Sequence, residues 1–202
     1  MTPTLVLCCT LEYLKDMLDV NFNPFPEIIT DRLRLLQFYA TDVNELYTLR
    51  SDKSIMRFIP RPLAQSPDDA EQLIQRFNDS ILANEAITWA ITWKNDNSVI
   101  GTVGYVKIDK PNYRAEIGYL LDTRHHGKGI MMEAVCSVVR YGFESMKLHS
   151  IEAVVHPENK ASSKLLVNNQ FMREGSFKDF QFFDGQFLDA DIYTRISGDA
   201  IL

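Results

Sequence analysis

The sequence is poor in the features that mark secreted or membrane-spanning proteins. It contains only three cysteines, and Cys8, Cys9 and Cys136 are too few and too unevenly spaced for a disulfide framework. No apolar window reaches the length of a membrane span. The apolar N-terminus lacks a basic flank and turns acidic at Glu12, which argues against a signal peptide. We therefore expect a protein of the reducing cytoplasm.

Basic charge is also scarce. The chain carries 21 lysines and arginines against 27 aspartates and glutamates, and its formal net charge is -6. Nucleic acids and anionic membranes require a positive field, so neither is expected as a partner. A length of 202 residues with 46% hydrophobic content suits one well-buried core. We expect one domain over residues 28–197, after an N-terminal appendage over residues 1–27 and before a C-terminal tail over residues 198–202.

Hydrophobic periodicity and turn residues indicate alternating strands and helices along the domain. A helix start is clearest at Ser66, an expected N-cap that is followed by Pro67 and acidic residues. The expected strands cover residues 29–38, 86–94, 98–108, 113–121 and 151–156. Four helices are expected. The first two begin after the N-cap residues Thr41 and Ser66, the third begins after Gly129, and the fourth begins near Asn159.

Two glycines and a lysine stand where an expected strand passes into an expected helix, in the stretch DTRHHGKGIMMEA (Asp122–Ala134). Gly127 and Gly129 would lie at the helix N-terminus, where free amides, the helix dipole and the missing Cβ favour a phosphate. The stretch lacks both the Walker pattern and the third glycine of the dinucleotide fingerprint. Neither of these nucleotide-binding families fits.

The residues Arg124 to Gly129 meet the Arg-x-x-Gly-x-Gly signature of the Gcn5-related N-acetyltransferases. The motifs AEIGYLLD, GKGIMMEAV and HPENKASSKLLVNNQF resemble the branch that includes the ribosomal-protein alanine N-acetyltransferases, and the resemblance runs from Ile29 to Ile196. It implies an α+β fold with a central mixed, mostly antiparallel sheet, flanked by helices and splayed at the acetyl-CoA-binding strand. It also implies an acyltransferase that moves the acetyl group of acetyl-CoA to a primary amine, on a protein N-terminus or a small molecule, by direct attack.

The same resemblance implies which residues bind acetyl-CoA. In the family, the pyrophosphate lies on the amides of the glycine loop, and the pantetheine pairs with the end of the preceding strand. Carried over, the cofactor-binding residues are Tyr119, Leu120, Leu121, Arg124, His125, His126, Gly127, Lys128, Gly129, Ile130, Asn159 and Ser162. Asn159 is also a sufficient N-cap for the helix that follows it.

Acetylation of an amine requires a base that removes the amine proton. The family resemblance gives this role to Glu116 in AEIGY, often through a water molecule. Strand alternation places Glu116 on the face opposite Ala115 and Ile117. The alternative to the catalytic role is a structural one, in which Glu116 forms an ion pair with Arg114.

The reaction also requires a proton for the departing thiolate and donors for the oxyanion. The resemblance places Ser162 near the sulfur as the acid, although a serine in the first turn of a helix is often only a capping helper. Tyr119 and Tyr193 are competing donors. A backbone amide near Leu120 would meet the oxyanion.

Two other function classes remain open. A CoA-binding or interaction module would keep the glycine loop without the chemistry. A metal-dependent hydrolase would use the histidines, but the four histidines lack a paired helical spacing, so no metal is expected. The acceptor pocket is expected between the helices of residues 42–83 and the C-terminal hairpin.

The C-terminal region departs from the family pattern. Gln170-Phe171 stands where Gly-Phe is usual, so we expect Asn168 or Asn169 to take the left-handed conformation. The aromatic stretch from Phe177 to Phe187 predicts a hairpin around Asp184-Gly185 with mostly buried rings. Any remaining rings would face the acceptor or a second subunit, which leaves a homodimer open.

Overall fold

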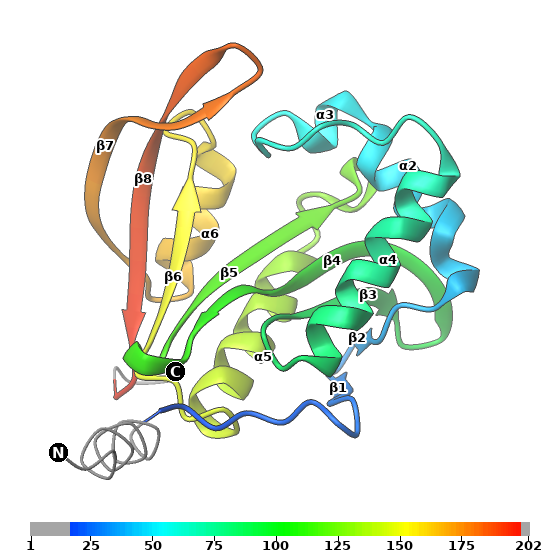
Figure 1. The fold of residues 1–202 in the computed structure, drawn as a ribbon, viewed down its shortest axis with the longest axis horizontal. Coiled ribbons are helices and arrows are strands. Elements are labelled where there is room, and N and C mark those ends of the chain that lie inside the picture. Colours follow the sequence, from blue (N-terminus) through cyan, green and yellow to red (C-terminus); the bar gives the residue numbers. More distant parts are fainter. Residues whose placement is uncertain (1–16, 199–202) are drawn as a thin grey trace, which may run out of the picture.

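The computed structural model describes residues 17–198, and Figure 1 shows one twisted sheet with helices on both faces. The eight strands lie in the order β1-β2-β3-β4-β5-β6-β8-β7, and all neighbours are antiparallel except β5 and β6. The strands are β1 (Ile28–Ile29), β2 (Leu33–Leu36), β3 (Ile87–Trp93), β4 (Asp96–Asp109), β5 (Arg114–Leu121), β6 (Ser150–Val155), β7 (Met172–Phe183) and β8 (Gln186–Ile196). The α+β class with a mixed, mostly antiparallel sheet is confirmed.

The helices divide between the two faces of the sheet (Figure 1). One face carries α2 (Val43–Ser51), α3 (Lys53–Met56) and α4 (Pro67–Leu82), and the other carries α5 (Ile130–Glu144) and α6 (Lys160–Asn168). Short 3-10 turns cover Ala40–Asp42, Lys110–Asn112 and Thr123–His125. No helix within residues 17–198 is long and apolar enough to cross a membrane.

A separate cluster of buried side chains lies against each face. Trp89 and Tyr105 are fully buried on the α5 face, where the Tyr105 hydroxyl donates a 2.8 Å hydrogen bond to the Val138 carbonyl. Phe38 and the α2 residue Leu46 are buried in the cluster on the face that carries α2 and α4. Burial on both faces explains why β3 is a continuous run of buried residues without the alternation of a half-exposed strand.

The parallel pair β5 and β6 is joined only at its beginning. The register pairs Arg114 with Ser150, Ala115 with Ile151 and Glu116 with Glu152, and no further pair follows. Beyond Glu116 the two strands diverge (Figure 1), so the second half of β5 has backbone groups that no strand of the described chain pairs on that side. Backbone groups left in this way are available to a bound molecule.

Most of the expected elements are present, with local shifts. The first expected strand is two short strands, β1 and β2, and α2 begins after Asp42 and not directly after Thr41. The start of α4 is as expected, because Ser66 precedes Pro67 and the Asp69 carboxylate accepts a 3.2 Å hydrogen bond from the Ser66 amide. The C-terminal hairpin turns at Asp184-Gly185 as expected. The hairpin of β3 and β4 is also present, but it turns at Lys94 and Asn95, earlier than the turn expected at residues 95–97.

Two expectations for the C-terminal region are wrong. The left-handed residue after α6 is Gln170, with φ of 64°, while Asn169 has φ of -91°. The Arg195 guanidinium donates to the Asn169 carbonyl (3.0 Å) and to Gln170 Oε1 (2.8 Å), and these bonds offset the cost of that conformation. The aromatic rings of β7 and β8 are mostly exposed, since this hairpin forms the outermost part of the sheet. About half or more of the side chain is exposed at four positions: Phe177, Phe180, Phe182 and Phe187.

Residues 17–27 pack against the domain. Leu18 and Phe22 are buried in the α5-side core, and the Trp89 indole donates a 2.7 Å hydrogen bond to the Pro26 carbonyl. The boundary between an appendage and a domain near residue 28 stays a prediction. Residues 1–16 and 199–202, with Cys8, Cys9 and most of the expected tail, lie outside the described residues.

Candidate active site

The glycine loop presents a row of backbone donors at the start of α5. Gly127 and Gly129 have φ of 72° and 74°, values that glycine adopts most readily, and Gly129 is the N-cap of α5. A Cβ on Gly127 would meet nothing within 4 Å, so its backbone borders open space. Among the hydrogen bonds of residues 17–198, none uses the amides of residues 127–130 as donors. Four free amides at a helix N-terminus fit the oxygens of a diphosphate.

An ion pair with Arg32, which lies between β1 and β2, supports this loop. Arg32 Nε lies 2.6 Å from Glu133 Oε2 in the first turn of α5, and Arg32 Nη1 donates a 3.0 Å hydrogen bond to the Lys128 carbonyl. Thr30 Oγ1 donates to the other oxygen of Glu133 at 2.5 Å. Burial alone would raise the pKa of Glu133, but the hydrogen bonds from Thr30 and Arg32 hold it below its ordinary value. Sequence reasoning missed Arg32 because its partner lies about a hundred residues away.

The residues before the glycines are held to the loop itself. The buried Asp122 carboxylate accepts from the Arg124 amide (2.8 Å) and pairs with its guanidinium (2.6 Å), and these bonds lower the pKa of Asp122. The Arg124 side chain is 78% exposed, so its charge also reaches the solvent beside the loop. Lys128 Nζ donates a 2.9 Å hydrogen bond to the Arg124 carbonyl. The loop therefore carries positive charge at both of its basic positions.

The two histidines of the loop face different surroundings. His125 packs edge-on against Trp93 at 5.9 Å between ring centroids, and burial lowers its pKa. His126 Nε2 lies 3.1 Å from the Leu121 carbonyl. Within residues 17–198, no group of three histidine, cysteine, aspartate or glutamate side chains is placed to hold a metal ion.

Two hydroxyl groups meet beyond the point where β5 and β6 part. Tyr119 Oη lies 2.7 Å from Ser162 Oγ, which joins the end of β5 to the first turn of α6. Asn159 Oδ1 accepts a 3.1 Å hydrogen bond from the Ser162 amide, so Asn159 is the N-cap of α6. Burial raises the pKa of Tyr119 to about 12, and the phenol is protonated at every physiological pH. Tyr193, the other candidate donor, is buried in the core at 5% exposure.

Glu116 occupies the last position at which β5 pairs with β6. Its side chain is half-buried, while Ala115 and Ile117 beside it are buried in the α5-side core. Burial, and then repulsion from Glu152, raise the pKa of Glu116 above its ordinary value. Arg114 Nη1 lies 3.6 Å from Glu152 Oε2, so the ion pair of Arg114 joins it to Glu152. A carboxyl group with a raised pKa is a stronger base once it is ionised.

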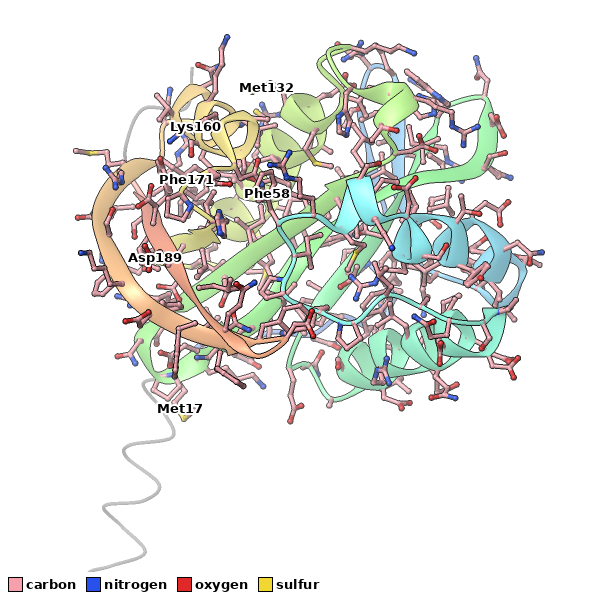
Figure 2. The ribbon with its side chains drawn as sticks, turned by 90° about the horizontal axis from the view of Figure 1, so that it is seen from above. Met17, Phe58, Met132, Lys160, Phe171 and Asp189 are labelled. Carbon is pink, nitrogen blue, oxygen red and sulfur yellow. The ribbon has the colours of Figure 1, made fainter. Side chains whose placement is uncertain are left out.

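A cavity of about 670 Å³ lies near the C-terminal end of β6. Its walls come from α3 and the segment after it, from His156 and Glu158 directly after β6, and from the β7–β8 turn in the expected C-terminal hairpin. The Phe58 ring lies 5.4 Å from the His156 ring, and Figure 2 shows Phe58 on the side of the α3 segment that faces α6, where Lys160 is labelled. This volume is in the range of small-ligand sites.

Comparison with known proteins agrees with this geometry. The family model of the acetyltransferase (GNAT) domain matches residues 32–172. The chain is 36% identical over 169 residues to the uncharacterized N-acetyltransferase p20 of Bacillus licheniformis, covering 84% of this chain and 95% of that protein. It is 32% identical over 96 residues to the ribosomal protein uS5-alanine N-acetyltransferase of Escherichia coli K12, covering 47% of this chain and 50% of that protein.

A solved structure supports the same assignment. The ribosomal-protein-S5-alanine acetyltransferase from Vibrio fischeri superposes with a TM-score of 0.77 at 25% identity, covering 86% of this chain and 98% of that one. The family model spans well over half of the present chain. The chain therefore belongs to the GNAT family and is an acetyl-CoA-dependent N-acetyltransferase.

Proposed function

We propose that the protein transfers the acetyl group of acetyl-CoA to the free α-amine of a peptide or protein, by direct attack of the amine on the thioester. One observation carries this proposal: β5 and β6 part directly after Glu116, and the Tyr119–Ser162 pair and the free amides of the glycine loop follow beyond that point. The similar proteins described as uS5-alanine acetyltransferases act on a ribosomal protein, and this similarity favours a protein acceptor over a small amine.

Glu116 is the proposed base. Its oxygen takes the amine proton, directly or through water, while the amine nitrogen forms the new bond to the carbonyl carbon and the carbon–sulfur bond breaks. The backbone amides near Leu120 stabilise the negative charge that develops on the carbonyl oxygen. The electron pair of the broken bond stays on sulfur. Glu116 then releases the proton through solvent to this thiolate, which gives the free thiol of CoA and restores the base.

The Tyr119–Ser162 pair stabilises the departing sulfur. If Tyr119 donates its hydrogen to Ser162 Oγ, the serine hydrogen is left to point toward the sulfur. An ordinary thiol has a pKa of about 8.5, well below the pKa of Tyr119, which is about 12. The pair therefore acts through a hydrogen bond to the thiolate, and Tyr119 keeps its own proton.

Loss of this hydrogen bond is expected to slow turnover. Ser162→Ala should lower kcat by on the order of 10²-fold with little change in acetyl-CoA affinity, because the bond is made only as the sulfur departs. Tyr119→Phe should have a smaller effect, and the double variant should be no slower than Ser162→Ala alone. Ser163→Ala is the matched control, since Ser163 lies in the same helix turn and donates to the Asn159 carbonyl. A large affinity loss with kcat intact would make Ser162 a cofactor-positioning residue.

The acceptor class is tested with a panel of amines and release of free CoA thiol as the readout. A peptide with a free N-terminus should support thiol release, and the same peptide with a blocked N-terminus should not. Polyamines, amino acids and aminoglycosides should be acetylated with a lower kcat/KM than the free peptide. A small amine that exceeds the peptide would overturn the choice of acceptor and leave acetyl transfer in place.

A further inference from the structure

Three arginines line a second cavity beside the one described above. This cavity has a volume of about 540 Å³ and lies among α2, the segment that follows α3, and α4. Arg50 comes from the end of α2, Arg61 from the segment after α3, and Arg76 from α4. In a chain with a net charge of -6, these residues concentrate positive charge in one hollow.

The three guanidinium groups repel one another without a compensating carboxylate at contact distance. Among residues 17–198, none of them makes a side-chain hydrogen bond or an ion pair within 4 Å. Burial, and then the charges of Arg61 and Arg76, lower the pKa of Arg50. Asp69 also lines the cavity, but its Oδ2 accepts from the amides of Gln65 (2.7 Å) and Ser66 (3.2 Å) at the start of α4. A bound anion would relieve the repulsion.

The arginine cavity shares a wall with the first cavity, which lies where the acceptor pocket is expected, between the α2–α4 region and the C-terminal hairpin. Arg61, Pro62, Leu63 and Gln65 line both cavities. The charge of Arg61 also acts on Glu116, the proposed base. An extended peptide advances by about 3.3–3.6 Å per residue, so a peptide whose N-terminus reacts would extend several residues beyond the amine, along the cavities that Arg61 lines.

We propose that the arginine cavity binds carboxylate side chains of an acidic acceptor peptide, a few residues beyond the amine that is acetylated. This inference rests on the proposed function, because it assigns the substrate class of the same site. The guanidinium fork matches the two oxygens of a carboxylate, and the partly buried Arg50 gains more from such a partner than an exposed arginine does.

The test compares the peptides Ala-Asp-Asp-Asp-Asp-Gly and Ala-Asn-Asn-Asn-Asn-Gly, with a free N-terminus and a label at the C-terminus. Binding in the presence of CoA and kcat/KM with acetyl-CoA are measured for the wild type, Arg76→Gln and Arg140→Gln. Arg76 is exposed on α4, so its replacement leaves the core unchanged. Arg140 is the matched control, since it is an exposed arginine on α5, on the other face of the sheet.

The wild type should bind and acetylate the aspartate peptide roughly ten- to a hundredfold better than the asparagine peptide. Salt should reduce this preference, because exposed charges are screened. Arg76→Gln should lose most of the preference, because its affinity and kcat/KM should fall for the aspartate peptide and stay unchanged for the asparagine peptide. Arg140→Gln should keep the preference. Equal binding of the two peptides by the wild type, or a preference unchanged in Arg76→Gln, would overturn the inference.

The binding measurement and the acetylation measurement together separate this inference from the proposed function. A binding preference that depends on Arg76, without acetylation of either peptide, would support the anion site and contradict peptide acetylation. Acetylation of both peptides with equal kcat/KM and equal affinity would support peptide acetylation and remove the anion site.

Discussion

Glu116→Gln is expected to lower turnover at neutral pH by roughly 10²–10⁴, because the substitution keeps the size of the side chain and deletes the oxygen that accepts the amine proton. Acetyl-CoA affinity should barely change. The ratio of the variant rate to the wild-type rate, at saturating acceptor, should rise with pH as more of the amine arrives deprotonated. A ratio near one at every pH would remove Glu116 from the mechanism.

Unfolding of the variant should not account for that loss. Burial raises the pKa of Glu116 in the folded state, so the stability it contributes is present below its unfolded pKa and is lost as the pH rises through the folded value. At neutral pH the ionised carboxylate therefore costs stability, and Glu116→Gln should melt at the same or a higher temperature. A lower melting temperature would contradict this account of the Glu116 environment.

Glu152→Gln is the matched control for the base. Glu152 lies opposite Glu116 in the last β5–β6 pair and repels its charge. Removal of that charge should keep turnover within a few fold of the wild type at neutral pH. It should also lower the pKa of Glu116, so the acidic limb of the pH profile should move to lower pH.

Gly129→Glu is expected to abolish measurable binding of acetyl-CoA while the protein remains folded. The new side chain would place a carboxylate beside the free amides of the loop, where it would repel phosphate groups. It would also force a residue with a Cβ into φ of 74°, with that Cβ 3.4 Å from Arg32 Nη2. Calorimetric titration with acetyl-CoA is the measurement.

Gly185→Glu separates the charge effect from the backbone cost. Gly185 has φ of 79° in the β7–β8 turn, and a Cβ there meets nothing within 4 Å. The control therefore carries the same conformational penalty away from the glycine loop, and its acetyl-CoA affinity should match the wild type. Unchanged affinity in Gly129→Glu would place the cofactor elsewhere.

Features with local causes could be predicted from the sequence. The start of α4 depends on Ser66 and Pro67, and the glycine loop depends on Gly127 and Gly129, so short stretches contain the whole signal. The splayed sheet followed from the family resemblance and not from the periodicity of the strands. The divergence itself lies between segments that are more than thirty residues apart.

Contacts between distant segments could not be predicted. The Tyr119–Ser162 hydrogen bond joins residues 43 positions apart, and the Arg32–Glu133 pair joins residues 101 positions apart. Alternating aromatic residues indicated the β7–β8 hairpin, but alternation does not show whether another element covers the strand. The exposed rings lie in the β7–β8 hairpin, which forms the outermost part of the sheet.

The most direct test of direct acetyl transfer is rapid mixing of the protein with acetyl-CoA, first without and then with a free-amine peptide. We predict no burst of thiol in the absence of the peptide, because no residue takes the acetyl group. With the peptide, thiol and N-acetylated product should form in a ratio of one to one. A burst of one thiol per protein without the peptide would reveal an acetylated enzyme, and bound CoA with no product from any amine would make the protein a binding module. Either result would contradict the mechanism.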